Sequence, residues 1–446
     1  MSSGPRQAPR SGWWADRTDR TDLLGWLGLA GAGLAASWLA SQTQLRVGTA
    51  SPPFSGSYLL RVGPPSLLAP AVAAVVLVAA ARSVTDRWPW RMVLLGSYLA
   101  ATAWALALAL ADGRAGLAAP VNAPEEYLAD LDRVNGGPLR YLQDFVADGA
   151  SLTVATRSHP PLPLLLLWLL ERVGVRSPLA LGVVLTMVAS LTVPAVLVAV
   201  RSLCGGAAAR QLAPVLALAP YAVWVAVSMD GVTAALAAGS VTAAVIGSEH
   251  GRRWWVSLTG ASVAGLLLGV AALFSYSVAW LAVSVMCVYF VRRRPLLNVV
   301  TAAFALLPLA LAELAGFSWP AGLAAAQRDV VTRIAPHRSA LLWGLLGLAV
   351  LVLACGPALV RSARRVRATP GWPFLVGAAA GVAFAVLAGL ARSDVERSWL
   401  PFFPWLLVAS VAPVRPAGEP PPAPIWLIAA GALTGVVIQA VLVSPW

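Results

Sequence analysis

The 446-residue chain contains no lysine, few acidic residues and few charges of any kind. Only 11% of its residues are charged, whereas a soluble protein would carry about 25%. All 32 basic residues are arginines, and 19 residues are acidic. Together with 59% hydrophobic residues and a mean hydropathy of +0.76, this composition excludes a soluble globular protein and predicts a polytopic membrane protein.

Cysteine is also scarce. The three cysteines lie far apart, and Cys287 and Cys355 fall within apolar runs, so their spacing indicates neither a disulfide framework nor a zinc site. We find no convincing glycine-rich phosphate loop, metal-ligand cluster or Ser-His-Asp pattern. The sequence therefore predicts no cofactor, and it leaves a requirement for a divalent cation open. The polar N-terminus has no cleavage site after the first apolar run, so we expect no signal peptide.

The expected fold class is all-α, a polytopic bundle of transmembrane helices. Apolar runs of roughly 15–22 residues recur along the chain, near the length of ~20 that crosses the hydrocarbon core. Their high Gly and Ala content is expected where helices approach closely. Thirteen spans are predicted at 23–40, 66–81, 92–111, 179–200, 212–226, 230–247, 256–272, 277–291, 297–315, 339–358, 371–391, 398–413 and 425–443.

These runs divide the chain into four parts. We predict a cytoplasmic N-terminal tail (1–22), two N-terminal spans (23–91), a large transmembrane module (92–413) that includes an acidic outward loop (112–160), and a linker with the last span (414–446). Short interfacial helices are expected in the acidic loop. The linker itself is the proline-rich stretch 416–424.

The arginine clusters orient the spans, because cytoplasmic loops of membrane proteins are enriched in basic residues. The loops that carry clusters should be cytoplasmic: 82–91, 201–210, 252–253, 292–294 and 361–367. The remaining polar segments should face outward: the acidic loop, 228–230, 274–276, 316–338 and 392–397. We therefore expect a multi-pass protein of the cell membrane with a cytoplasmic N-terminus. The clusters account for the net charge of +13, which makes the lipid bilayer a partner and argues against nucleic acid.

One apolar stretch, 160–173, breaks this alternation. It is too short for a typical span, and a crossing here would move every later arginine cluster to the outside. We predict a half-inserted or interfacial helix that begins after Pro160-Pro161. The alternative is a helix that does cross, together with one span missed elsewhere.

Carboxylates are concentrated in one place, since residues 120–168 hold six of the 19 acidic residues. Pro124 followed by acidic residues favours a short helix, on which Glu126 and Asp130 would be one turn apart and share a face. A carboxylate at a membrane interface can act as a general base toward a hydroxyl. Glu126, Glu125 and Asp130 are therefore candidate catalytic residues, and the alternative is a solvated acidic helix.

Three further residues lie at the junctions between loops and spans. His159 precedes two prolines and is a candidate to bind a phosphate or an acceptor, although a lone histidine is more often structural. Asp230 is a functional candidate because a carboxylate at a membrane boundary is costly, and its alternative role is a helix N-cap. Tyr276 lies in a similar turn, where an interfacial aromatic anchor is the alternative.

The segment 392–397 is the densest charge cluster after the acidic loop. The planar fork of donors on arginine suits phosphate, whereas internal pairs with Asp394 or Glu396 are the alternative. The arginines that could hold the phosphate of a lipid carrier are Arg328, Arg333, Arg338, Arg392 and Arg397.

Several motifs occur together in a recognisable order. An acidic first outward loop with Glu-Tyr inside it, ending in His-Pro-Pro-Leu before a leucine-rich helix, resembles the GT-C membrane glycosyltransferases. Protein O-mannosyltransferases and aminoarabinose lipid A transferases are well-known members. Later segments such as APYAVWVAVSMDG and DVERSWLPFFPWLL are similar to uncharacterised actinobacterial relatives, and the lysine-free composition fits a high-GC genome of that kind. The resemblance covers roughly residues 90–413.

The resemblance implies a GT-C-like catalytic module at 92–413 and an active site that faces outward. It implies a polyprenyl-phosphate sugar donor, an extracytoplasmic acceptor (an envelope glycan, lipid or protein) and inversion at the anomeric carbon. By position, Glu126 or Glu125 matches the acidic catalytic residue, and His159 matches the His-Pro-Pro motif. The positions that match polar sites of the relatives are Asp230, Glu396 and Arg397. The chain departs from the family in having Glu-Glu where Asp-Glu or a single Asp is usual, and in its two extra spans before residue 90.

From these matches we expect Glu126, His159, Asp230 and Arg397 to line one outward cavity. Two other functions stay open. A transporter or flippase of a lipid-linked solute would carry charged residues within spans, and Glu313 is the clearest case. A non-catalytic partner of an envelope-polymer assembly machine would have no activity of its own.

Overall fold

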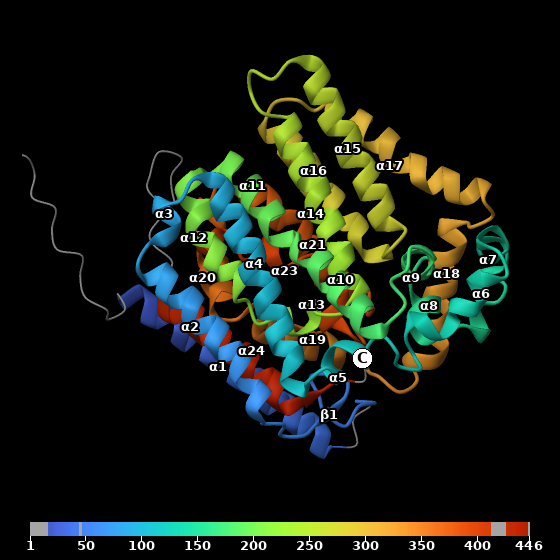
Figure 1. The fold of residues 1–446 in the computed structure, drawn as a ribbon, viewed down its shortest axis with the longest axis horizontal. Helices are drawn as coiled ribbons and strands as arrows, with labels where there is room; N and C mark the ends of the chain where they lie inside the picture. Colours follow the sequence, from blue (N-terminus) through green and yellow to red (C-terminus); the bar gives the residue numbers. More distant parts are fainter. Residues whose placement is uncertain (1–16, 44–46, 412–424, 445–446) are drawn as a thin grey trace, which may run out of the picture.

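A computed structural model describes residues 17–43, 47–411 and 425–444. Within these residues the chain is almost wholly helical, so the predicted all-α class is confirmed (Figure 1). The described strands are β1 (Ser57–Tyr58) and β2 (Leu442–Val443), which pair antiparallel with Ser57 opposite Val443. This short pair was not predicted, and it joins the N-terminal part of the chain to its C-terminal end.

The N-terminal half contains long helices on either side of a group of short ones. The long and medium helices are α1 (Arg17–Gln42), α2 (Leu68–Ala81), α4 (Trp90–Ala109), α9 (Leu162–Arg172), α10 (Pro178–Ser190), α11 (Thr192–Cys204) and α12 (Gly206–Ala217). The short α-helices are α3 (Val84–Arg87), α5 (Ala115–Ala118), α6 (Leu131–Asn135), α7 (Pro138–Asp144) and α8 (Val154–Ser158). The 3₁₀ turns are η1 (Pro64–Leu67), η2 (Leu110–Asp112), η3 (Tyr127–Asp130) and η4 (Gly149–Ser151).

The C-terminal half follows the same pattern. Its long and medium helices are α14 (Met229–Gly247), α15 (Trp254–Ala272), α16 (Leu281–Val291), α17 (Leu297–Leu314), α18 (Trp319–Asp329), α19 (Ala340–Cys355), α20 (Pro357–Arg365), α21 (Trp372–Leu387) and α24 (Ile425–Val441). The short α-helices are α13 (Ala222–Val225), α22 (Val395–Ser398) and α23 (Phe403–Leu406). The remaining turns are η5 (Tyr276–Trp280), the π-helix η6 (Val330–Ile334), η7 (Val366–Ala368) and η8 (Val408–Ser410).

Seven described helical segments are long and apolar enough to cross a membrane, which indicates a membrane-embedded protein. They coincide with seven of the predicted spans: Arg20–Gln42, Pro64–Ala81, Trp90–Asp112, Pro178–Cys204, Met229–Gly247, Trp254–Ala272 and Leu297–Leu314. An eighth would be the pair α19 and α20, which is bent by 101°. Apolar helices of 10–17 residues occupy three more predicted spans, namely Tyr276–Val291, Trp372–Leu387 and Ile425–Val441. The total of thirteen therefore stays a prediction.

Two predicted spans are not continuous helices. The first, 212–226, is interrupted at Pro220 between α12 and α13. The second, 398–413, consists up to Val411 of the short elements α23 and η8, and its side chains from Trp399 onward are buried. Pro401 and Pro404 explain why this segment is not one continuous helix, because proline lacks the backbone N–H that would continue it. Apolar sequence alone did not reveal that this segment lies inside the bundle.

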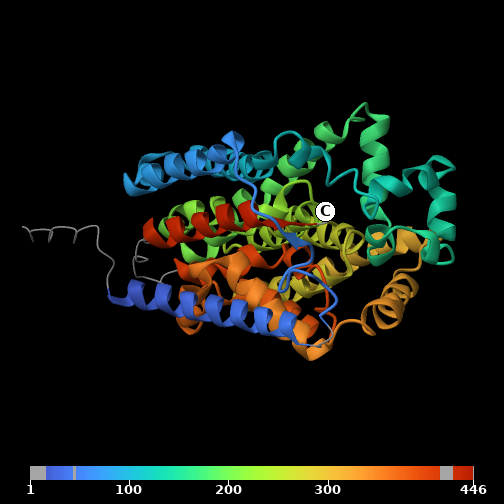
Figure 2. The ribbon, with the colours of Figure 1, turned by 90° about the horizontal axis from the view of Figure 1, so that it is seen from below.

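The long helices run side by side, and the polar segments between them gather at two ends (Figure 2). At one end, Arg210 Nη1 donates to the Trp88 carbonyl at 2.8 Å, and Arg292 Nη2 donates to the Ser202 carbonyl at 2.8 Å. These contacts join loops that carry arginine clusters. At the other end, the acidic loop and α18 project together in both views (Figures 1 and 2).

Helix α9 occupies the stretch that broke the predicted alternation. Its 11 residues are too few to cross a bilayer, and it buries Leu164 and Leu167 against the acidic loop. A second apolar cluster thus forms under the loop, around Val134, Leu164 and Phe317, in addition to the main cluster inside the bundle.

Parts of two predicted domains, the N-terminal tail and the linker, lie outside the described residues. Helix α1 begins at Arg17, so part of the predicted tail 1–22 is helical. Residues 1–16 of that tail and the predicted linker 416–424 lie outside the described residues.

Close helix packing predicts one stability effect. Gly265 and Gly269, one turn apart on α15, face α17, where an added Cβ would overlap the carbonyl oxygens of Thr301 and Ala305. Gly265→Ala should therefore lower the thermal stability of the detergent-solubilised protein, because overpacking typically costs about 1–3 kcal/mol. Gly31→Ala in α1 is the control, since no atom lies within 4 Å of its added Cβ. Equal melting temperatures for the two variants would contradict the packing of α15 on α17.

Candidate active site

A buried arginine joins the acidic loop to the helical bundle. Arg397 Nη1 donates to Glu126 Oε1 at 2.5 Å, and its Nε lies 3.4 Å from Asp230 Oδ2. Only 12% of the Arg397 and Glu126 side chains and 5% of the Asp230 side chain are exposed. Burial lowers the pKa of Arg397, but the charges of Glu126 and Asp230 outweigh burial and raise it above its usual range.

His159 completes this cluster from the end of α8. Its Nε2 lies 3.6 Å from Asp230 Oδ1, and its Nδ1–H donates to the Ala155 carbonyl at 3.0 Å. Burial lowers the pKa of His159, yet the contacts with Asp230 and Ala155 raise it on balance above its usual value. Tyr127 packs edge-on against the ring at 5.9 Å. The four residues expected to converge are thus brought together.

A strained turn places Asp230. Val227 has φ +66°, which is rare for a β-branched residue, and its N–H donates to Thr186 Oγ1 at 3.0 Å. Ser228 then caps α14, with its hydroxyl accepting from the Asp230 N–H at 3.1 Å. The alternative role of Asp230 as the N-cap is therefore wrong, because Ser228 caps the helix and the Asp230 carboxylate faces Arg397 and His159.

Glu126 and Asp130 do not share a face, contrary to expectation. Glu126 is extended and precedes the 3₁₀ helix η3, so α-helical spacing does not apply. Asp130 is buried, and its Oδ2 accepts from both N–H and Oγ1 of Thr153 at 2.8 Å. Asp130 therefore holds the start of α8 and lies away from Arg397. Glu125 is exposed.

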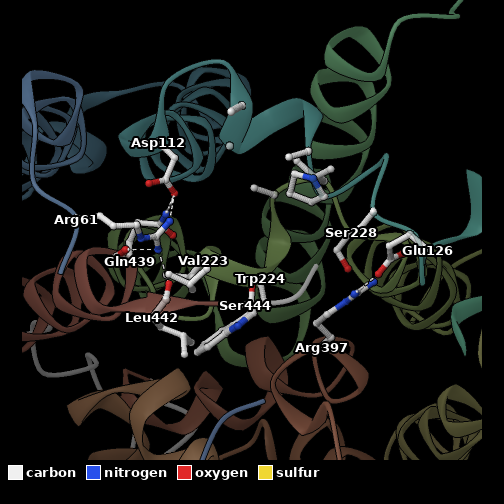
Figure 3. A pocket seen from close by; sticks show the side chains of 18 residues that line it. Arg61, Asp112, Glu126, Val223, Trp224, Ser228, Arg397, Gln439, Leu442 and Ser444 are labelled. Atoms are coloured by element: carbon white, nitrogen blue, oxygen red, sulfur yellow. Dashed lines mark hydrogen bonds and ion pairs between the residues drawn. The ribbon is translucent and has the colours of Figure 1, made fainter. Parts of the chain in front are cut away.

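A cavity of about 480 Å³ lies beside the ion pair. Glu126, Arg397 and Ser228 line one side of it (Figure 3). On the other side Arg61 binds Asp112, and Gln439 Nε2 donates to the same carboxylate at 3.0 Å. Apolar side chains form much of the remaining wall, including Val223, Trp224 and Leu442. Asp230 contacts Arg397 and His159 contacts Asp230, but neither of the two lines this cavity, contrary to the expectation that all four residues would.

No protein-family model, curated protein or solved structure matches the chain.

Glu396 is not part of the ion-pair cluster. It is fully buried, its Oε1 accepts from the Ser55 N–H at 3.5 Å, and no described group hydrogen-bonds to its Oε2. Burial, and then the nearby Asp394 carboxylate, raise the pKa of Glu396 to about 8. Asp394 itself has a pKa raised by burial to about 6. Glu396 is therefore neutral in part at pH 7 and is held by the segment that contains Ser55.

The other predicted arginines serve different contacts. Arg392 Nε donates to the Gly389 carbonyl at 2.7 Å, and Arg338 Nη1 donates to the Arg392 carbonyl at 2.8 Å, so both hold backbone. Arg333 pairs with Asp329 at 2.8 Å in a separate cavity. The arginines predicted to hold a phosphate therefore do not converge on one site.

Two other candidates lie apart from the cluster. Tyr276 packs edge-on against Trp319 at 5.4 Å, and its buried hydroxyl has no hydrogen-bond partner among the described residues. Glu313, considered as a charge within a span, is exposed in the last turn of α17. Within the described part of the chain, no group of three or more His, Cys, Asp or Glu residues is arranged to hold a metal ion.

The polar cavity residues Arg61, Asp112 and Gln439 were not predicted from the sequence. Arg61 and Gln439 lie in the N-terminal and C-terminal parts, outside the stretch that carries the resemblance, and Asp112 lies at the first residue of the acidic loop. One of them could have been found from the sequence. Gln439 is the single Gln in the otherwise apolar run 425–443, and a polar side chain in such a run needs a partner.

The raised pKa of Glu396 predicts a pH effect on stability. The unfolded carboxyl loses its proton near its ordinary pKa of about 4.3, while the folded one keeps it until about pH 8. The folded state thus binds more protons in this window, so stability should fall as pH rises from 5 to 8.5. Glu396→Gln should match the wild type at pH 5 and melt several degrees higher at pH 8.5.

Thermal melts across this pH range check the effect, with Glu125→Gln as the exposed control. Asp394→Asn should remove the part of the stability loss that occurs near pH 6, where the Asp394 carboxyl loses its proton. If the melting temperature of Glu396→Gln changes with pH in the same way as that of the wild type, the buried Glu396 carboxyl does not titrate between pH 5 and 8.5.

Proposed function

We propose that the chain is a membrane glycosyltransferase. It moves a sugar from a polyprenyl-phosphate carrier to a hydroxyl of an envelope glycan, lipid or protein on the outer side of the membrane. The main support is the Glu126–Arg397 ion pair on the wall of the 480 Å³ cavity. A proton acceptor beside a guanidinium offers the two groups that transfer from a phosphate carrier needs.

Glu126 acts as the general base in this proposal. It takes the proton of the acceptor hydroxyl, whose oxygen forms a bond to the anomeric carbon as the bond from that carbon to the phosphate oxygen breaks. The electron pair leaves with the lipid phosphate. In-line attack inverts the anomeric centre.

Arg397 stabilises the leaving group at the moment it forms. In the resting site its charge is balanced by Glu126 and Asp230. Protonation of Glu126 removes one of these negative charges, so the guanidinium charge becomes available as charge develops on the phosphate. An interaction that strengthens only in the transition state is the kind that accelerates a reaction.

Asp230 and His159 position Arg397 rather than react. Asp230 holds the guanidinium from behind the cavity, and His159 contacts Asp230. The apolar wall around Trp224 and Leu442 suits the first isoprene units of the carrier.

The proposal requires the acidic-loop end to face outward. In a background that lacks the three native cysteines, Asn122→Cys should react with a membrane-impermeant thiol reagent in intact cells, whereas Arg253→Cys should not. Both positions are exposed, so access depends on the side of the membrane. The opposite labelling pattern would place the cavity in the cytoplasm and contradict an extracytoplasmic acceptor.

Glu126→Gln tests the chemistry. The amide keeps the size of the side chain but cannot accept the proton, so sugar transfer from a polyprenyl-phosphate donor should fall about 10²–10⁴-fold. Glu125→Gln, next to it and exposed, is the matched control and should keep activity. Excess donor should not rescue Glu126→Gln. Full activity of Glu126→Gln would remove Glu126 as the base.

Arg397 is better tested by lysine than by alanine. Alanine would leave two buried carboxylates without a cation, at a cost of about 3–5 kcal/mol to folding. Arg397→Lys keeps the charge but loses the planar fork that matches the developing phosphate charge, so we expect a lower kcat with little change in the KM for the donor. An unchanged kcat would contradict stabilisation of the leaving phosphate by Arg397.

A further inference from the structure

A second cavity, of about 270 Å³, lies between the acidic loop and α18. Its charged lining consists of Arg157, Arg328, Arg333 and Asp329, which sum to a formal charge of +2. It shares no lining residue with the 480 Å³ cavity. It is formed by loop segments and by α18 and η6, outside the seven long apolar segments.

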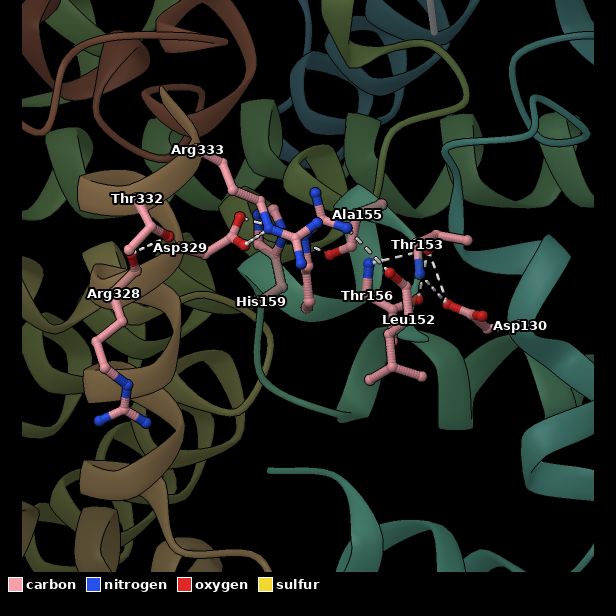
Figure 4. Close-up of polar contacts among 11 residues, drawn as sticks. Asp130, Leu152, Thr153, Ala155, Thr156, His159, Arg328, Asp329, Thr332 and Arg333 are labelled. Atoms are coloured by element: carbon pink, nitrogen blue, oxygen red, sulfur yellow. Dashed lines mark hydrogen bonds and ion pairs between the residues drawn. The ribbon is translucent and has the colours of Figure 1, made fainter. Parts of the chain in front are cut away.

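The Asp329 carboxylate pairs with two of these arginines. Asp329 Oδ2 accepts from Arg157 Nε at 3.1 Å, and Asp329 Oδ1 pairs with Arg333 Nε at 2.8 Å. Arg328 is exposed and has no ion-pair partner among the described residues. Figure 4 shows Arg328 projecting away from the Asp329 carboxylate. The positive charge of the cavity is therefore not compensated by the protein.

A neighbouring cavity shows that the excess of positive charge is confined to the basic cavity. About 210 Å³ in volume, it lies on the other side of Phe145 and contains Arg133 and Arg140 together with Asp144 and Asp148. These four residues form two ion pairs, at 3.7 and 3.5 Å, and their charges cancel. The same loop thus builds one balanced cavity and one with two uncompensated positive charges.

The end of α8 contributes to both the basic cavity and the Arg397 cluster. Arg157 and His159 are two residues apart there, so their Cα atoms are within about 7 Å. His159 contacts Asp230, which contacts Arg397. Because the two cavities share no lining residue, a molecule anchored in the basic cavity must extend past α8 to reach Glu126.

We propose that the basic cavity binds an oxyanion, a phosphate or carboxylate group, carried by the glycosyl acceptor. Guanidinium forks match both groups in geometry. That the anion belongs to the acceptor rests on the proposed transferase function. The acceptor is then an anionic envelope polymer reached from water, whereas the lipid-linked donor occupies the apolar cavity.

Direct binding tests the site without turnover. Full-length Glu126→Gln protein in detergent is titrated calorimetrically with inorganic phosphate and, separately, with glucuronate. At least one probe should bind saturably, and Arg328→Gln in the same background should weaken it about 10- to 100-fold, as expected for charge-assisted hydrogen bonds. Arg140→Gln, in the balanced cavity, should leave binding unchanged. The stronger probe identifies the acceptor group as phosphate or carboxylate.

Two results would overturn the proposal. One is the absence of saturable binding for both probes. The other is an unchanged dissociation constant in Arg328→Gln and in Arg333→Gln, which would place any bound anion elsewhere. Because Arg328 has no ion-pair partner to lose, its variant should fold normally, and a thermal melt checks this.

Activity then separates this proposal from the transferase proposal. Arg328→Gln should raise the KM for an anionic acceptor about tenfold or more and leave kcat unchanged, whereas Glu126→Gln should lower kcat. If no transfer is found with the wild type but the titration succeeds, the cavity is an oxyanion site and the transferase proposal fails. If transfer occurs without an effect of Arg328→Gln on KM, the acceptor assignment fails alone.

Discussion

The Arg397 guanidinium is the charge on which the end of the molecule that carries the acidic loop depends. A buried cation needs compensating anions, and here they come from two separate elements, Glu126 in the acidic loop and Asp230 on α14. Loss of the guanidinium would leave two buried carboxylates without a cation. The ion pairs therefore fix the position of the acidic loop on the bundle, at the place where the proposed transfer needs a proton acceptor.

The remaining carboxylates of the loop show why it is more than a solvated acidic surface. Asp130 holds the start of α8, and Arg157 on that helix pairs with Asp329 of α18. Beneath them, Val134, Leu164 and Phe317 form an apolar cluster. The exposed carboxylates of the loop are those of Glu125, Asp132 and Asp148. The loop is thus a folded layer that positions His159 and Glu126.

The terminal parts of the chain complete the candidate site. Arg61 precedes α2, and Gln439 lies in α24, yet both contact Asp112 on the cavity wall. The pairing of β1 with β2 holds these two regions together. The segment between α1 and α2 therefore contributes Arg61 to the cavity wall, and α24 contributes Gln439.

Composition determined the helical class, because a long apolar chain in lipid must satisfy its backbone hydrogen bonds internally. The cost of charge at a membrane boundary singled out Asp230, whereas local sequence and the family resemblance singled out Glu126, His159 and Arg397. Tertiary structure decided which of them meet, since Glu126 and Arg397 are 271 positions apart and no local pattern joins them. It also separated Asp130 and Arg392 from the cluster and placed 398–411 inside the bundle. Of the predicted phosphate arginines, it placed Arg397 in one cavity and Arg328 and Arg333 in another. These outcomes depend on how helices pack in three dimensions, which hydropathy and residue spacing do not specify.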